Sequence, residues 1–110
     1  MFNLDDYETV DSRLKKYLKL YPDARVITKM HSNENGTVVF KAAIYEDGKA
    51  LSANLPKSTG WAEETKGEGG MANKNAHVEN CETSAIGRAL ANAGYSGDKR
   101  ASREEMIKVQ

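Results

Sequence analysis

The sequence predicts an α+β fold: an N-terminal helix, a three-stranded antiparallel β-meander, a long helix packed on the sheet and a short C-terminal helix. Apolar residues recur at helical spacing over residues 5–21 and again over residues 77–93, and alternating apolar positions lie between them. The chain has 110 residues, of which 39% are apolar, so we expect one domain over residues 1–110.

The first helix is expected over residues 5–21. Asp5 and Glu8 have the spacing of a capping box at its start, with Asp in place of Ser or Thr. Pro22 directly follows the last periodic residue and is typical of a helix end.

Three strands are expected after this helix. Arg25–His31 and Val38–Tyr45 alternate in polarity and are joined by Asn35-Gly36, which is typical of a two-residue hairpin turn. Asp47-Gly48 indicates a second turn, and Ala50–Leu55 is expected as the third strand.

Residues 56–76 are expected to form a flexible Gly/Lys loop, because four glycines and three lysines are interspersed there. Gly67–Ala72 loosely matches a dinucleotide-binding pattern, but that pattern requires a preceding parallel strand, which an antiparallel meander does not supply. Residues 97–110 form a charged tail, in which Ser102 and Glu105 have capping-box spacing for the short last helix.

The long helix is expected from His77 to Ala93, with Gly94 ending it. Glu82 lies in the middle of an apolar stripe on this helix, made by Val78, Cys81, Ala85, Ile86, Ala89 and Ala93. A carboxylate there must be paired or protonated, so we expect Glu82 to be a structural buried charge neutralised by an arginine or a lysine.

A second stripe on the opposite side of this helix consists of Ser84, Gly87 and Ala91. Such small residues allow another backbone to come close, so the stripe predicts a helix contact. Two occupants remain open: the first helix of the same chain, or a neighbouring subunit or nucleic-acid backbone.

The sequence favours neither a metal site nor catalysis, so we expect no cofactor and no enzyme activity. His77 and Cys81 have a spacing that can place two metal ligands side by side, but only His31 remains as a further soft donor. Cys81 lies on the apolar stripe, which does not suit a nucleophile.

The formal net charge is +0, so any nucleic-acid site must be a local basic patch. Lysines and arginines are expected to hold phosphates, while an aromatic residue stacks on bases. The candidate nucleic-acid-binding residues are Lys57, Trp61, Lys66, Lys74, Arg88, Lys99 and Arg100.

The single cysteine excludes an internal disulfide, and no apolar run approaches the length of a membrane span. The N-terminus is acidic and does not look like a signal peptide. We therefore expect a cytoplasmic protein, in the host cytoplasm if it is encoded by a phage, with no membrane partner.

Two segments resemble a known family. Val78–Leu90, which contains Glu-Thr-Ser-Ala-Ile-Gly-Arg-Ala-Leu, and Tyr21–Arg25 are similar to small proteins of actinobacterial phages and prophages, related to single-strand annealing proteins of the essential recombination function (Erf) type. The resemblance covers roughly residues 7–95. It implies a single-stranded DNA-binding and annealing protein of phage-type recombination that assembles with itself into a ring or filament.

A second function stays open because Arg88 is the single arginine at a place where that family has a more basic run. In this alternative, the chain is a phage protein-interaction module that binds or inhibits a host factor.

Overall fold

The computed structural model describes residues 3–68, 76–96 and 100–108. Its elements are η1 (Leu4–Asp6, a short 3₁₀ helix), α1 (Val10–Leu20), β1 (Arg25–Glu34), β2 (Thr37–Tyr45), α2 (Gly48–Ser52), β3 (Ser58–Thr65), α4 (His77–Asn92) and α5 (Arg103–Lys108). This order confirms the predicted fold class.

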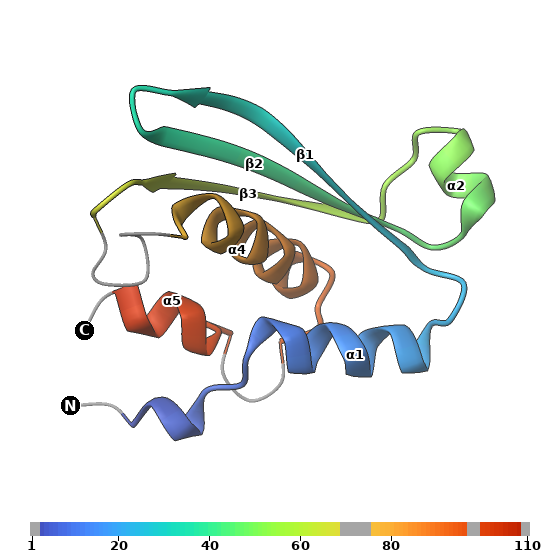
Figure 1. Ribbon diagram of the computed structural model, residues 1–110. Helices are drawn as coiled ribbons and strands as arrows, with labels where there is room; N and C mark the ends of the chain where they lie inside the picture. The colour runs from blue at the N-terminus through green and yellow to red at the C-terminus, as the bar shows by residue number, and fades with distance from the viewer. Residues whose placement is uncertain (1–2, 69–75, 97–99, 109–110) are drawn as a thin grey trace.

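The described elements form three layers (Figure 1). The antiparallel sheet, in the order β1-β2-β3, is the first layer, and α4 packs along one of its faces. Helices α1 and α5 form the third layer, on the side of α4 away from the sheet. Because α2 lies beyond one end of the sheet, none of the described helices covers the outer sheet face.

The first helix begins later than predicted, because Thr9 rather than Asp5 caps it. The Thr9 hydroxyl accepts a hydrogen bond from the Ser12 amide at 3.2 Å, which satisfies a free donor of the first turn. Asp5 lies instead in η1, where its amide donates to the side chain of Asn3.

The predicted hairpin between β1 and β2 is confirmed. Asn35 and Gly36 both have positive φ, at 53° and 80°, as a two-residue turn of this type requires. The alternation in β2 is also confirmed, because Val38, Phe40, Ala42 and Ile44 are buried against α4.

The third strand lies elsewhere than predicted. Asp47 caps a helix rather than a hairpin, because its Oδ1 accepts a hydrogen bond from the Ala50 amide at 2.8 Å. Leu55, the last residue of the strand expected over residues 50–55, is 68% exposed. The strand that completes the sheet is β3, which lies inside the stretch expected to be a loop over residues 56–76.

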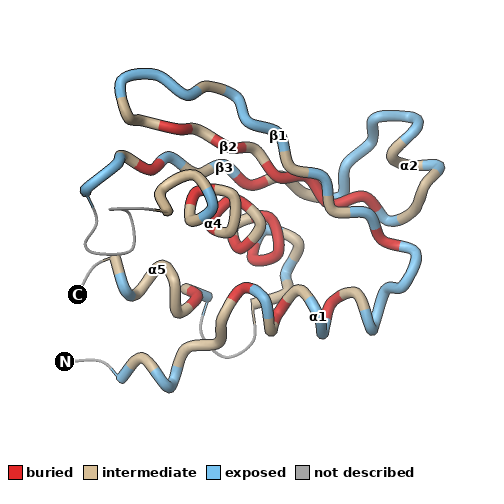
Figure 2. Tube along the Cα trace, in the orientation of Figure 1, coloured by how far each residue is buried: buried red, intermediate tan, exposed pale blue. Residues whose placement is uncertain are grey.

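Helix α4 approaches β3 unusually closely at Gly60. A Cβ atom added to Gly60 would lie 2.3 Å from the Ala89 amide nitrogen and 2.5 Å from the Ala85 carbonyl oxygen. Ala85 and Ala89 are themselves fully buried, and the buried segments of β2, β3 and α4 face one another in Figure 2. Small residues on both elements therefore set the spacing of the first two layers.

On the other side of α4, Gly87 sets the spacing to the third layer. A Cβ atom added there would lie 2.8 Å from Cγ2 of Val10 in α1. The close helix contact expected at Gly87 is thus made within the chain, by the first of the two occupants considered above.

We expect Gly60→Ala to destabilise the domain by about 3 kcal/mol, because its methyl group forces α4 away from β3. Thermal unfolding followed by circular dichroism measures the effect. Gly48→Ala is the matched control, since its nearest non-local neighbour is an Arg25 side-chain atom at 3.9 Å. Equal melting temperatures for Gly60→Ala and the wild type would contradict the tight contact.

Candidate nucleic-acid interface

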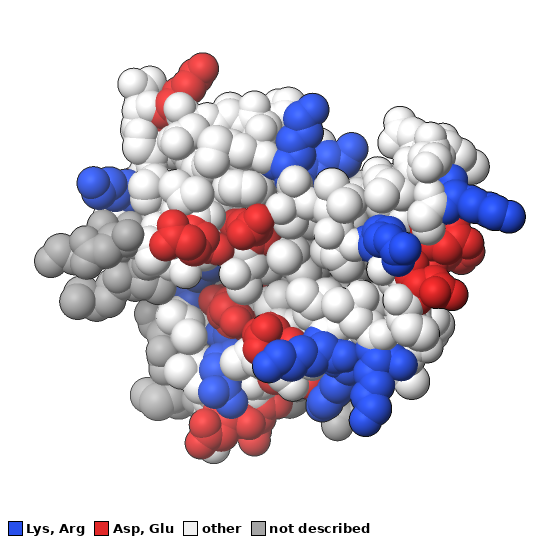
Figure 3. Space-filling model, turned by 45° about the vertical axis from the view of Figure 1, so that its right-hand side comes forward, with Lys and Arg blue, Asp and Glu red and all other residues white. Residues whose placement is uncertain are grey.

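Three lysines project from the exposed side of α1. Lys15 and Lys19 are one helical turn apart and lie on the same side, with Lys16 beside them. Lys16 and Lys19 flank a shallow hollow of about 430 Å³ that is also lined by Leu20 and Tyr95. These five residues are called the α1 surface below. Figure 3 shows Lys and Arg side chains gathered at the lower edge of the molecule, where α1 lies.

Acidic neighbours balance part of this charge. Lys16 Nζ lies 2.7 Å from a Glu8 carboxylate oxygen, and Lys15 Nζ lies 3.2 Å from Asp11. Among the ion pairs of the described residues, none involves Lys19. The α1 surface therefore keeps a positive excess even though the whole chain is neutral.

The pair between Glu8 and Lys16 is ionised at neutral pH. Burial tends to raise the pKa of Glu8, but hydrogen bonds from Lys16 and Ser12 and nearby positive charges outweigh it, so this pKa lies below its ordinary value of 4.5. The hydrogen bond to Glu8, and the charge of Glu8, raise the pKa of Lys16 above its ordinary value of 10.5.

A second group of cationic and aromatic side chains lies on the outer sheet face. Lys29, Lys41 and Trp61 are direct cross-strand partners along one row of the sheet. Lys41 Nζ is 5.6 Å from the centroid of the Trp61 ring, and the His31 ring lies 5.1 Å from it in an edge-on arrangement. These four residues are called the sheet surface below.

Trp61 was predicted from the sequence as a binding residue, but Lys29, Lys41 and His31 were not. The third strand was predicted in the wrong place, so its cross-strand partners could not be identified. With β3 at Ser58–Thr65, the alternation of side chains along strands places Trp61 opposite Lys41 and on the same face. The polar outer positions of β1 and β2 were the signal that could have identified this surface.

The predicted lysines do not form one patch. Lys57 lies at one end of β3, in a hollow of about 310 Å³ that three carboxylates also line: Asp23, Glu46 and Asp47. Lys66 lies at the other end, beside the turn at Gly36, roughly 30 Å away along the strand. The other two predicted lysines, Lys74 and Lys99, lie outside the described residues.

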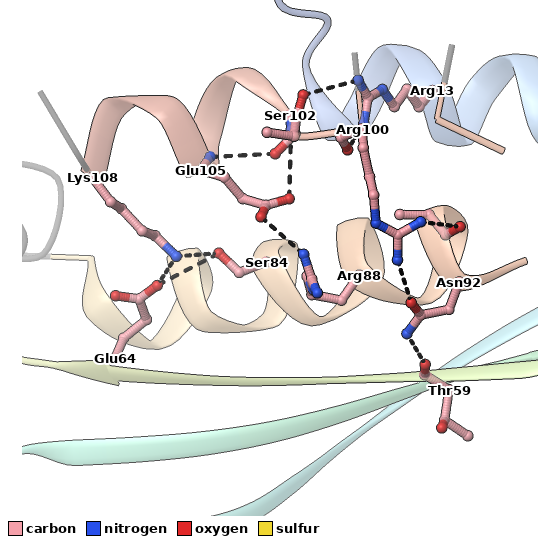
Figure 4. Close-up of polar contacts among 12 residues, drawn as sticks. Arg13, Thr59, Glu64, Ser84, Arg88, Asn92, Arg100, Ser102, Glu105 and Lys108 are labelled. Carbon is pink, nitrogen blue, oxygen red and sulfur yellow. Dashed lines mark hydrogen bonds and ion pairs between the residues drawn. The ribbon is translucent and has the colours of Figure 1, made fainter. Parts of the chain in front are cut away.

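The two predicted arginines make internal contacts (Figure 4). Arg88 is paired with Glu105 of α5 at 3.2 Å. Arg100 donates to the Ala91 carbonyl at 3.1 Å and to the Asn92 side chain at 2.7 Å. In the described structure their guanidinium groups attach the C-terminal segment to α4, so they are not arranged as free phosphate ligands.

Trp61 and Arg88 nevertheless line one hollow. It measures about 250 Å³ and lies between β3, α4 and α5, where Glu63, Glu105 and Lys108 also line it. Because carboxylates occupy the same hollow as the two cations, it is less suited to a phosphate chain than the α1 surface.

Glu82 is not the buried charge of the core. It is half-buried, and its carboxylate accepts a hydrogen bond from the Thr28 hydroxyl of β1 at 2.6 Å. A hydroxyl donor at the sheet edge therefore satisfies Glu82 without the arginine or lysine partner expected for a buried carboxylate.

The buried charged residues of the described structure are Arg13 and Glu64, which are 1% and 5% exposed. Arg13 donates to the carbonyl groups of Arg100 and Ala101, both at 3.1 Å. Glu64 is ion-paired with Lys108 of α5, whose Nζ also donates to the Ser84 hydroxyl at 2.6 Å (Figure 4). Both buried charges hold the C-terminal segment against the rest of the domain.

The stripe of Ser84, Gly87 and Ala91 is covered by the same segment and by α1. All three residues are buried. Ser84 contacts Lys108, Gly87 meets Val10, and the Ala91 carbonyl accepts from Arg100. The stripe is thus an intramolecular helix contact, and it offers no surface for a second subunit.

Cys81 is placed for packing. Its thiol is buried and donates weakly to the carbonyl groups of Val38 and Ala62 at 3.4 and 3.3 Å. Burial raises the pKa of the thiol, which keeps it protonated at neutral pH. No metal-binding cluster of His, Cys, Asp and Glu occurs within residues 3–68, 76–96 and 100–108.

This fold, with lysines on a peripheral helix and none of the described helices on the outer sheet face, is that of a small α+β domain. Residues 14–93 match the model of the family described as Slr1353 N-terminal dsRNA-binding domain-like, and the chain belongs to this family. The family description suggests nucleic-acid binding. No curated protein and no solved structure matches the chain.

The family match corrects the expected relationship to Erf-type annealing proteins. The resemblance rested mainly on residues 78–90, where small residues repeat along α4. The structure accounts for these residues by close packing on β3 and on α1, which any sheet-and-helix fold of this spacing requires. In the described part of the chain, no helix has the length and apolar character that a membrane crossing requires.

We expect Lys108→Ala to destabilise the domain by about 2–4 kcal/mol, because it leaves the Glu64 carboxylate buried without its cation. Chemical unfolding measures the loss. Adding Glu64→Gln to this variant should restore part of the stability, since a neutral amide is cheaper to bury than a carboxylate that has lost its cation. Lys49→Ala, on the exposed side of α2, is the control, and an equally small effect of both lysine changes would contradict the role of Lys108.

The lowered pKa of Glu8 predicts a loss of stability in acid. A carboxyl group whose pKa is lower in the folded state stabilises the fold above its unfolded pKa, near 4.5. This contribution disappears as the pH falls through the lower folded value. Unfolding free energies at neutral and acidic pH should therefore differ less in Glu8→Gln than in the wild type. Glu63→Gln, an exposed control, should keep the wild-type difference.

Proposed function

We propose that this domain binds double-stranded RNA through the α1 surface and catalyses no reaction on it. The observation that carries the proposal is the group of Lys15, Lys16 and Lys19 on one exposed side of a domain whose family is described as dsRNA-binding domain-like. The placement of the Cys81 thiol in the core supports a binding role over nucleophilic chemistry.

The shape and charge of the α1 surface suit an RNA duplex. The minor groove of A-form RNA is wide and shallow, and proteins recognise it by its shape, its phosphates and its 2′-hydroxyl groups. A peripheral helix can lie along such a groove without entering it. Lys15 and Lys19 would then contact phosphates, while the hollow lined by Leu20 and Tyr95 faces the sugars.

The other functional expectations stay predictions. Binding to single-stranded DNA, assembly into a ring or filament, a host protein partner and a cytoplasmic location are not tested by the fold or the family. Self-association now needs a surface other than the buried stripe of α4, and strand annealing loses its basis with the corrected family.

Fluorescence anisotropy with labelled oligonucleotides tests the proposal. We expect tighter binding to an RNA duplex than to a DNA duplex or either single strand of the same sequence. Replacing Lys15 and Lys19 together by Gln should weaken duplex binding. It should also reduce the salt slope, which is the slope of the logarithm of the binding constant against the logarithm of the salt concentration, by roughly 2 in magnitude, one unit for each lost phosphate contact. Lys16 is kept so that its pair with Glu8 stays intact.

The matched control is Lys49→Gln, an exposed lysine on α2, a separate helix beyond one end of the sheet. It should leave affinity and salt slope unchanged. A Lys15→Gln and Lys19→Gln variant with wild-type affinity and slope for duplex RNA would refute binding through the α1 surface.

A further inference from the structure

We propose that the sheet surface is a second nucleic-acid site, which stacks an unpaired nucleobase on Trp61 and holds the adjoining phosphates with Lys29 and Lys41. The inference rests on the proposed function in one respect only, namely that the ligand is a nucleic acid. It adds a different chemical form of the ligand and a different face of the molecule.

The position of the Trp61 ring is the first support. Trp61 lies on β3 and His31 on β1, so the two residues are separated by β2 and by roughly 10 Å of sheet. Their ring centroids are nevertheless only 5.1 Å apart. The two side chains therefore reach toward each other across the outer face of β2, which makes an aromatic platform on the sheet.

The platform is accessible. Trp61 is 49% exposed, although a tryptophan on a sheet usually gains from burial. The next row of outer positions consists of Ile27, Ala43 and Thr59, which are cross-strand partners. Ile27 in this row is 44% exposed, so the solvent-accessible area continues from Trp61 along the outer side of β1.

The charges around the platform favour a nucleotide as the occupant. Lys41 lies over the Trp61 ring and Lys29 is its exposed neighbour on β1. His31 adds a further donor. The carboxylate on this face near Trp61 is Glu63, two residues along β3. A phosphate chain would therefore run over β1 and β2, away from Glu63.

Only an unpaired base can use this site. Bases inside a duplex stack on each other and present no free ring face, whereas single strands can place a base on an aromatic side chain. Such stacking tolerates any sequence because every base has a π face. The sheet surface and the α1 surface lie on opposite sides of the layered fold, so each can be altered independently (Figure 1).

Tryptophan fluorescence tests the proposal directly, because Trp61 is the single tryptophan in the sequence. A short oligouridylate should quench this emission to saturation. A blunt-ended RNA duplex should bind, as measured by anisotropy, without quenching it. Trp61→Ala should weaken oligouridylate binding about 5- to 100-fold, while Trp61→Phe retains most of the affinity.

Two further variants separate the sheet surface from the α1 surface. Replacing Lys29 and Lys41 by Gln should weaken oligouridylate binding and lower its salt slope, with duplex binding unchanged. The Lys15→Gln and Lys19→Gln variant should show the reverse pattern. Circular dichroism melts of every variant confirm that each is folded.

The outcomes distinguish the two proposals. Duplex binding with no quenching by oligouridylate would overturn the second site and leave the first intact. Quenching by oligouridylate without duplex binding would support the second site and overturn the first. Equal quenching by poly-glutamate would overturn the nucleobase assignment, because that polymer matches the lysines but has no ring to stack.

Discussion

The close approach of α4 to β3 is the constraint on which the rest of this structure depends. Gly60 allows the backbone of α4 to lie against the strand, and the methyl groups of Ala85 and Ala89 fill what space remains. Because α4 carries small residues on both of these faces, α1 can also come close to it at Gly87. One glycine on the strand and one on the helix therefore set the close spacing of the three layers.

The arginines and the lysines divide the electrostatic roles. Arg13, Arg88 and Arg100 each bind backbone carbonyls or a carboxylate within the domain. A guanidinium group suits this role because its planar array of donors can satisfy several acceptors at once. Most of the described lysines instead lie on the α1 surface, the sheet surface and the ends of the sheet, where an ammonium group can meet phosphates. Lys108 differs from them, because it neutralises the buried Glu64.

The sequence allowed the fold class, the β1–β2 turn and the inner face of β2 to be predicted, because each has a strong local signal. β3 escaped prediction because its inward residues are Gly60, Ala62 and Glu64, which show no apolar alternation. The identity of the buried charges escaped for a related reason. Whether a carboxylate is buried depends on which distant segment covers it, and α5 covers Glu64 but not Glu82.

The ion pair between Glu64 and Lys108 of α5 also has a consequence for sequence variation within the family. The family match spans residues 14–93, so Arg13 and Lys108 both lie outside it while Glu64 lies inside. A carboxylate buried as deeply as that of Glu64 is strongly destabilising when its cation is removed. We therefore expect relatives that lack a C-terminal helix equivalent to α5 to carry an uncharged residue at position 64.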